Sequence, residues 1–144
     1  MAQFHVDRFY RATPELIWKF LNDFEASRSE RIHATILEPG DPDHNNSGLI
    51  RELKINGATI REKILAISPG ESIEYQLISG VPVHDYYGTI FVYPEREGTT
   101  VRWVVSFKSD FPWPEWLIKR RAVRHIESIL DEMAKVVQDT TDKE

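Results

Sequence analysis

The sequence contains no cysteine. This absence excludes a disulfide framework, a thiolate metal site and a cysteine nucleophile. Long hydrophobic runs are missing too: no stretch approaches the roughly 20 apolar residues of a membrane span, and the first ten residues lack the apolar core of a signal peptide. We therefore expect a soluble, cytoplasmic protein without stable insertion into a membrane.

An excess of positive charge is also absent. The chain has 144 residues, with 18 Lys and Arg against 23 Asp and Glu, for a net charge of −5. Proteins that bind nucleic acids usually carry a basic surface, so we expect no nucleic-acid partner. The length fits one domain, predicted over residues 1–138, and the polar residues 139–144 are expected to form a frayed tail.

Histidines are few and lack the spacing of metal ligands. The five stand at positions 5, 33, 44, 84 and 125, and no two of them are four residues apart. A zinc site usually places its ligands at short, regular spacings. We therefore expect no metal.

The order of the predicted elements is strand, helix, strands and a final helix. Residues 4–11 are rich in aromatic and β-branched side chains and predict a strand. Thr13-Pro14-Glu15 then predicts a helix start, with Thr13 as the cap. A strand is predicted over residues 32–38, and turn signals divide residues 48–109 into about five more. From Pro114 onward, apolar residues recur at helical spacing for about 25 residues.

The dipeptide Asn56-Gly57 is the strongest short hairpin signal, because a type I′ turn needs positive φ at both central positions. A two-residue loop here fixes the register of the flanking strands. On the apolar face, Arg51 stands opposite Glu62. The other expected pairs are Ile55 with Ala58, Leu53 with Ile60, and Leu49 with Ile64.

The same counting extends the inner face through the next turns. In the last strand, Val101, Trp103, Val105 and Phe107 alternate with polar residues and are expected to point inward. The strand before it is ambiguous, because one face carries His84 and Tyr86, the other carries Tyr87 and Phe91, and a one-residue slip exchanges them. The further expected pairs are Ala66 with Ile73, Ile64 with Tyr75, Glu62 with Leu77, Leu77 with Tyr86, and Ser79 with His84.

This inner face gathers more polar groups than a dry core usually holds. Burying an unpaired charge costs several kcal/mol. Two interpretations remain open at this stage. Either Arg51 and Glu62 satisfy each other structurally, or the face lines a cavity that holds a ligand.

Several segments carry a family resemblance through their order and spacing. They are Ala12 to Trp18 with Asp23-Phe24, Gly48-Leu49-Ile50-Arg51, Arg61-Glu62-Lys63-Ile64, Tyr75, Gly80 to Thr89, and Gly98 to Trp103. Together they resemble the START-like (SRPBCC, helix-grip) superfamily, in its polyketide cyclase/dehydrase-like branch, over residues 3–138. The resemblance implies an α+β fold: a curved seven-stranded antiparallel sheet around a long C-terminal helix, with two short helices after the first strand. It also implies an internal cavity and no metal or nucleotide cofactor.

We therefore expect binding of an apolar or aromatic small molecule, lipid- or polyketide-like, between the sheet and the last helix. An alternative is a cyclase or dehydratase in which Glu62 acts as acid or base and Arg51 holds a carbonyl oxygen. A third is a co-chaperone-like interaction module, which needs an exposed apolar patch. The candidate ligand-binding residues are Arg51, Glu62, Tyr75, His84, Tyr86, Trp103, Phe107 and His125.

Two features near the last helix have competing interpretations. The basic residues Lys119, Arg120, Arg121 and Arg124 are expected to form a solvated face, with weak contact to anionic lipid as the alternative. The two tryptophans of segment 111–116, Trp113 and Trp116, are expected to cap the end of the core. Their alternatives are a lid over the cavity and insertion at a membrane surface. Ligand identity, oligomeric state and cavity size stay undecided at this level.

Overall fold

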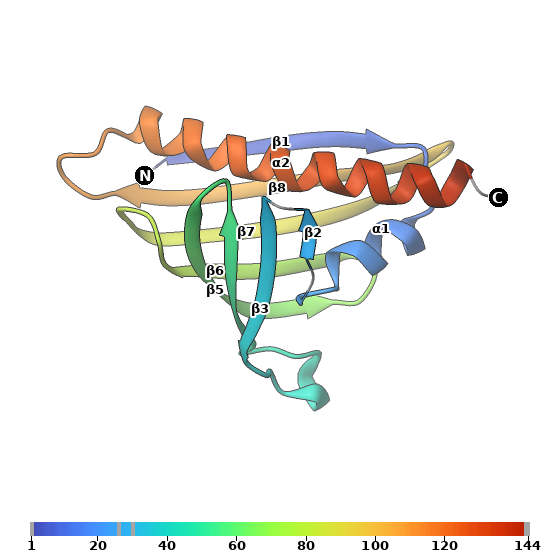
Figure 1. Cartoon of the computed structure of the whole chain (residues 1–144), viewed down its shortest axis with the longest axis horizontal. Helices are drawn as coiled ribbons and strands as arrows, with labels where there is room; N and C mark the ends of the chain where they lie inside the picture. Colours follow the sequence, from blue (N-terminus) through green and yellow to red (C-terminus); the bar gives the residue numbers. More distant parts are fainter. Residues whose placement is uncertain (1, 26, 30, 143–144) are drawn as a thin grey trace.

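Figure 1 shows the computed structural model of the chain, which describes residues 2–25, 27–29 and 31–142. Eight strands form one antiparallel sheet in the order β1-β8-β7-β6-β5-β4-β3-β2. The strands are β1 (Ala2–Tyr10), β2 (Ser27–Ser29), β3 (Ile32–Glu38), β4 (Ile50–Ile55), β5 (Ala58–Ser68), β6 (Ser72–Ser79), β7 (Val83–Glu95) and β8 (Gly98–Ser109). The helices are α1 (Pro14–Leu21), the 3₁₀ turn η1 (Pro42–His44) and α2 (Glu115–Asp142).

The predicted α+β fold is confirmed. Seven strands have six residues or more, and β2 is a three-residue addition that pairs with β3 at the sheet edge. The second short helix expected after the first strand is not found among the described residues between α1 and β3. Asn22 ends α1, and the short segment that follows pairs Ser27 with His33 instead. Helix α2 continues to Asp142, into the segment expected as a tail.

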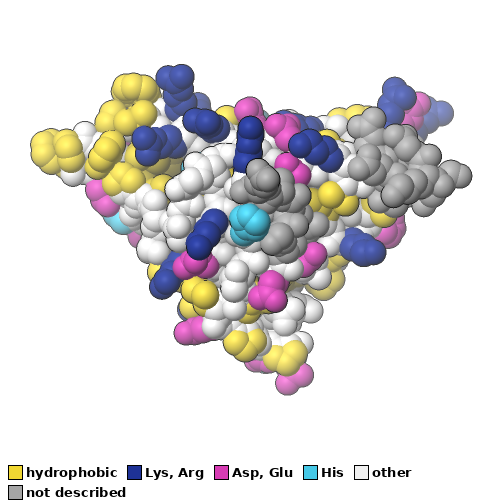
Figure 2. All heavy atoms as spheres, viewed as in Figure 1, with side chains coloured by type: hydrophobic (Ala, Val, Ile, Leu, Met, Phe, Trp, Pro, Cys, Tyr) yellow, Lys and Arg dark blue, Asp and Glu magenta, His cyan; other side chains and the backbone are white. Residues whose placement is uncertain are grey.

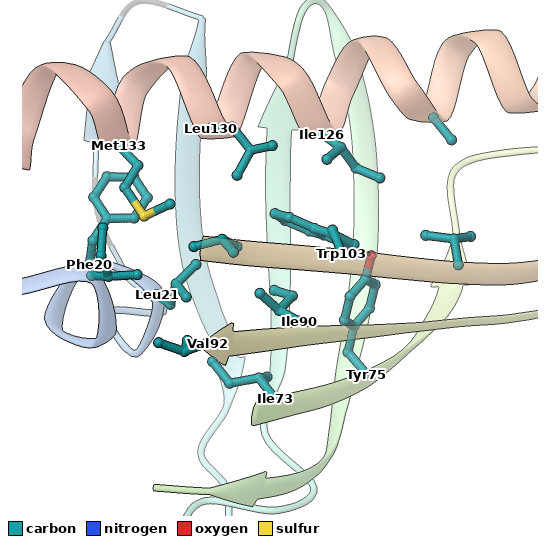
Figure 3. Packing of buried hydrophobic residues seen from close by; sticks show 14 of the residues in the cluster. Phe20, Leu21, Ile73, Tyr75, Ile90, Val92, Trp103, Ile126, Leu130 and Met133 are labelled. Atoms are coloured by element: carbon teal, nitrogen blue, oxygen red, sulfur yellow. Dashed lines mark hydrogen bonds between the residues drawn. The ribbon is translucent and has the colours of Figure 1, made fainter. Parts of the chain in front are cut away.

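Helix α2 packs its apolar stripe against the sheet. Figure 1 shows α2 lying across one face of the sheet, along β1 and β8. Figure 3 shows Ile126 and Leu130 pointing from the helix toward Trp103, and Met133 pointing toward Phe20. Burial of this stripe removes apolar surface from water, which is the main force that holds helix and sheet together. The buried stripe comprises Ile118, Ala122, Ile126, Leu130, Met133 and Val137.

Helix α1 closes one end of the core. The Oγ1 atom of Thr13 accepts a hydrogen bond of 3.3 Å from the backbone N–H of Leu16, which confirms the predicted cap. The buried side chains of the helix are Ile17, Phe20 and Leu21. Phe24, two residues after the cap at Asn22, is buried as well.

The hairpin prediction is confirmed at the turn. Asn56 and Gly57 have φ values of 50° and 82°, and Arg51 lies opposite Glu62. One expected pair on the next hairpin is wrong: Ala66 lies opposite Glu74, because the register shifts between Ile64 and Ala66. That β-bulge restores the expected register toward the middle of the sheet, where Ile64 pairs with Tyr75 and Glu62 with Leu77.

Strand β7 also contains a register shift, and this shift decides which of its side chains point inward. Tyr86 is buried, whereas Tyr87 is 38% exposed. Asp85 has a positive φ of 52°, and the pairing with β8 shifts between His84 and Tyr87. A bulge reverses which face the preceding residue occupies. The facing that the sequence left open is therefore split by the bulge: Tyr86 points inward, whereas His84 does not.

The tryptophans beside the start of α2 do not cap the core as expected. Trp113 is 43% exposed and Trp116 is 65% exposed. Phe111, in the same segment, is 98% exposed, so aromatic side chains face solvent at this end of the molecule. No helix in the described part of the chain is both long and apolar enough to cross a membrane.

Candidate functional site

An internal space lies between the sheet and α2. It has two adjoining parts, of about 50 Å³ and about 40 Å³. The second part lies toward the first turns of α2 and includes Arg121 and His125, and the first lies toward α1 and includes Phe20 and Phe24. The residues common to both parts are Leu53, Glu62, Tyr75, Trp103 and Ile129.

Arg51 and Glu62 form an ion pair on the wall of this space. The Nε atom of Arg51 donates to Oε2 of Glu62 at 3.0 Å, and their side chains are 15% and 8% exposed. The guanidinium carbon of Arg51 also lies 5.6 Å from the ring centroid of Phe24, which adds a cation–π contact. The pair is therefore satisfied internally and lines the cavity at the same time.

Trp103, Tyr75 and Tyr86 form an aromatic cluster beside the pair. The Nε1–H of Trp103 donates to the hydroxyl oxygen of Tyr75 at 2.9 Å, with the two rings at 85° (Figure 3). The ring of Tyr75 also lies 6.5 Å from that of Tyr86, centroid to centroid. Tyr86 lies on the wall of the second part of the cavity.

Both tyrosine hydroxyls keep their protons near neutral pH. Burial raises the pKa of Tyr75 well above its ordinary value, and the neighbouring Tyr86 and Glu62 raise it further. Burial and the charge of Glu62 likewise raise the pKa of Tyr86. The cavity wall therefore offers neutral hydroxyl donors beside an ion pair.

Gly88 makes room for the Tyr75 ring. The two residues lie opposite each other on β7 and β6. A Cβ atom at position 88 would lie 2.3 Å from Cζ of Tyr75, closer than any real contact allows. The missing side chain therefore sets how the Tyr75 ring lies and how its hydroxyl reaches Trp103.

His125, one of the candidate ligand-binding residues, lines the second part of the cavity. Its Nδ1 atom accepts from Nδ2 of Asn56 at 3.3 Å, and the same amide donates to Oγ of Ser128 at 3.0 Å. Burial lowers the pKa of His125, and the charges of Arg124 and Arg121 lower it further. The ring is therefore held neutral, between the hairpin turn and α2.

A family model for polyketide cyclase/dehydrase and lipid transport proteins matches residues 1–138. The chain belongs to this family. The match covers the whole sheet and α2 up to position 138, so the cavity described above lies within the family domain.

Solved structures share the family fold at low sequence identity. The protein XoxI from Bacillus cereus is 19% identical, with a TM-score of 0.79, over 98% of this chain and 99% of that one. A START superfamily protein from Mycobacterium smegmatis is 18% identical, with a TM-score of 0.77, over 96% and 98%. Ara h 8.0201 is 15% identical, with a TM-score of 0.77, over 96% and 98%. These likenesses show a START-like helix-grip fold, and no curated protein matches the sequence.

Among the residues expected to bind a ligand in this family member, two lie outside the cavity wall. The side chain of His84 is 56% exposed and pairs with Asp110 at the surface. Phe107 is fully buried and lies 6.0 Å from Tyr86, ring centroid to centroid, so it supports the cavity wall from behind. The residues that do line the cavity are Arg51, Glu62, Tyr75, Tyr86, Trp103 and His125.

Sequence reasoning missed three charged residues that also line the cavity of this family member. Asp23 and Glu132 line the first part, and Arg121 lines the second. Glu132 and Arg121 each stand one position beside the apolar stripe of α2, and that position is the signal that places them at the cavity edge. Within the described residues, no three His, Asp or Glu side chains gather where they could hold a metal ion.

Proposed function

We propose that this protein binds an apolar or aromatic small molecule, lipid- or polyketide-like, in the space between the sheet and α2. The observation that carries the proposal is an internal cavity with mostly apolar walls and a small set of convergent polar groups. Apolar walls supply most of the affinity for such ligands, and a few polar groups set their orientation.

The hydroxyl of Tyr86 is the proposed orienting donor. Tyr86 lines the second part of the cavity, and burial and the charge of Glu62 raise the pKa of its hydroxyl, so the hydroxyl keeps a hydrogen that it can donate to an acceptor on the ligand. A carbonyl or ether oxygen is the matching group. Arg51 and Glu62 are already paired to each other and act as a polar boundary of the site.

The size of the cavity implies that a ligand widens it. The two parts measure about 50 Å³ and about 40 Å³. Sites for drug-sized ligands usually measure about 300–1,000 Å³. Leu53 of β4 and Ile129 of α2 line both parts, so we expect the helix and this strand to separate when a ligand binds.

The experiment compares two tryptophan substitutions in α2. Ile129→Trp fills the cavity, whereas Val136→Trp adds the same side chain at a position that is 40% exposed. Binding of the apolar fluorophore 1-anilinonaphthalene-8-sulfonate and of a long-chain fatty acid is measured by fluorescence and by native mass spectrometry. We expect Ile129→Trp to lose binding and Val136→Trp to keep it. Equal binding by both variants would contradict an internal site.

A second candidate function is catalysis of ring closure or dehydration in the same cavity. The observation that favours it is a carboxylate, Glu62, whose charge acts on two protonated hydroxyls, those of Tyr75 and Tyr86. A carboxylate base beside hydroxyl donors is suited to enolisation of a bound ketone. The test is Glu62→Gln, which abolishes turnover of an aromatic polyketide but preserves its binding if Glu62 is the base. If Glu62→Gln keeps both turnover and binding, Glu62 is not the base, and ligand binding remains the proposed function.

A further inference from the structure

We propose that one end of this protein docks on the surface of an anionic lipid bilayer. The docking surface consists of segment 111–116 and the basic residues Lys119, Arg120, Arg121 and Arg124 in the first turns of α2. Figure 2 shows hydrophobic side chains gathered at the end of the molecule where β8 leads into α2, with Lys and Arg side chains directly beside them.

The aromatic part of the docking surface is open to solvent. Phe111 is 98% exposed, Trp113 is 43% exposed and Trp116 is 65% exposed. The segment also has a defined backbone, because the N–H of Trp113 bonds to the carbonyl of Asp110 at 2.8 Å and that of Leu117 to the carbonyl of Pro114 at 3.2 Å. An ordered, protruding set of aromatic side chains without an apolar partner costs solvation free energy in water.

The charged part has the sign that an anionic bilayer attracts. The four cations follow Trp116 within eight residues, in a protein whose net charge is −5. Glu115 is the acid within this stretch. Two nearby acids already have partners: Asp110 bonds to the imidazole of His84, and Asp85 pairs with Lys108 at 3.6 Å.

The arrangement favours a lipid surface over a protein partner. Trp116, Lys119 and Arg120 share one face of α2, because they are three and four residues apart. Tryptophan prefers the headgroup level of a bilayer, and basic side chains beside it pair with anionic headgroups. Further along α2, Glu127, Asp131 and Glu132 reverse the sign of the charge, so only the first turns of the helix are attracted to such a surface.

The docking surface adjoins the cavity. Arg121 is exposed and also lines the second part of the cavity, next to Ile118. A ligand dissolved in the bilayer would therefore meet the cavity where the protein touches the membrane. This consequence rests on the proposed function, whereas docking itself does not.

The experiment is sedimentation of the full chain with vesicles of phosphatidylcholine alone or mixed equally with phosphatidylglycerol. We expect binding only to the mixed vesicles, weakened by salt and accompanied by a blue shift of tryptophan emission. Phe111→Ser with Trp116→Ser, and Arg120→Glu with Arg124→Glu, are each expected to weaken binding by more than about tenfold. Controls are Tyr93→Ser, which removes an aromatic side chain that is 43% exposed elsewhere, and Lys63→Glu on β5.

Circular dichroism verifies that each variant is folded. No binding to mixed vesicles, or equal binding by the wild type to both kinds of vesicle, would overturn the proposal. A concentration-dependent dimer that Phe111→Ser with Trp116→Ser abolishes, without any vesicle binding, would assign the surface to a second copy of the chain. These results are independent of the fluorophore test, so a failure of docking is distinguishable from a failure of ligand binding.

Discussion

Arg51 on β4 and Glu62 on β5 lie opposite each other, face the interior of the protein and share a 3.0 Å hydrogen bond. When one partner is removed, the charge of the other stays buried, with neither an ion-pair partner nor enough water to solvate it. We expect Glu62→Ala to lower the free energy of unfolding by about 3–5 kcal/mol, the range measured for buried ion pairs. Urea unfolding followed by circular dichroism measures this loss.

Replacement of both partners provides the control for the ion pair. Arg51→Met combined with Glu62→Leu keeps the volume and removes both charges, so we expect it to recover most of the lost stability. A double variant that is no more stable than Glu62→Ala would show that the cost comes from packing and not from the unpaired charge.

The hydroxyl of Tyr75 is expected to contribute to stability through Trp103. Tyr75→Phe leaves the buried Nε1–H of Trp103 without its acceptor at 2.9 Å. A buried unsatisfied donor costs about 1–3 kcal/mol. Thermal and urea unfolding should show this loss, whereas Tyr93→Phe, at a side chain that is 43% exposed, should change stability by less than about 0.5 kcal/mol. Equal effects of the two substitutions would refute the role of this bond.

Alkaline pH is expected to destabilise the protein through its buried tyrosines. Burial raises the pKa of Tyr10, Tyr75 and Tyr86 above the ordinary value of 10.0. A raised pKa in the folded state means that the stabilisation is complete below about pH 10 and is lost as the pH rises further. Absorbance at 295 nm should reach the signal of all five tyrosines only when circular dichroism reports unfolding. Full ionisation of a folded protein would contradict this expectation.

Mildly acidic pH is expected to destabilise the protein through His125. Its pKa lies below the ordinary value of 6.5, because of burial first and then the charges of Arg124 and Arg121. The unfolded chain therefore binds this proton more readily, and the stabilisation falls as the pH drops below about 6.5. We expect His125→Gln to reduce the loss of stability between about pH 7.5 and pH 5.5. An NMR titration of the His125 ring measures its pKa directly. A midpoint at or above 6.5 would contradict this prediction.

The sequence was sufficient to predict the register around Arg51 and Glu62, because Asn56-Gly57 accepts only one kind of tight turn and pairing then follows by counting. The same counting did not decide the facing of His84, since the bulge at Asp85 adds one residue that pairing by count does not include. For segment 111–116 the sequence favoured a cap on the core over its two alternatives, whereas Phe111 and Trp116 are exposed. Hydrophobic pattern predicts burial on average, but side chains where a strand leads into a helix at the end of the molecule have little surface to pack against.

Asn56 has a second consequence beyond the turn that it forms. Its amide fastens the β4–β5 turn to Ser128 and His125 in the middle of α2. Lifting the helix away from this hairpin breaks both bonds at once, so turn and helix behave as one cooperative element in local opening. Amide hydrogen exchange at the turn therefore reports on how often the helix lifts, and a molecule held beneath α2 should slow that exchange.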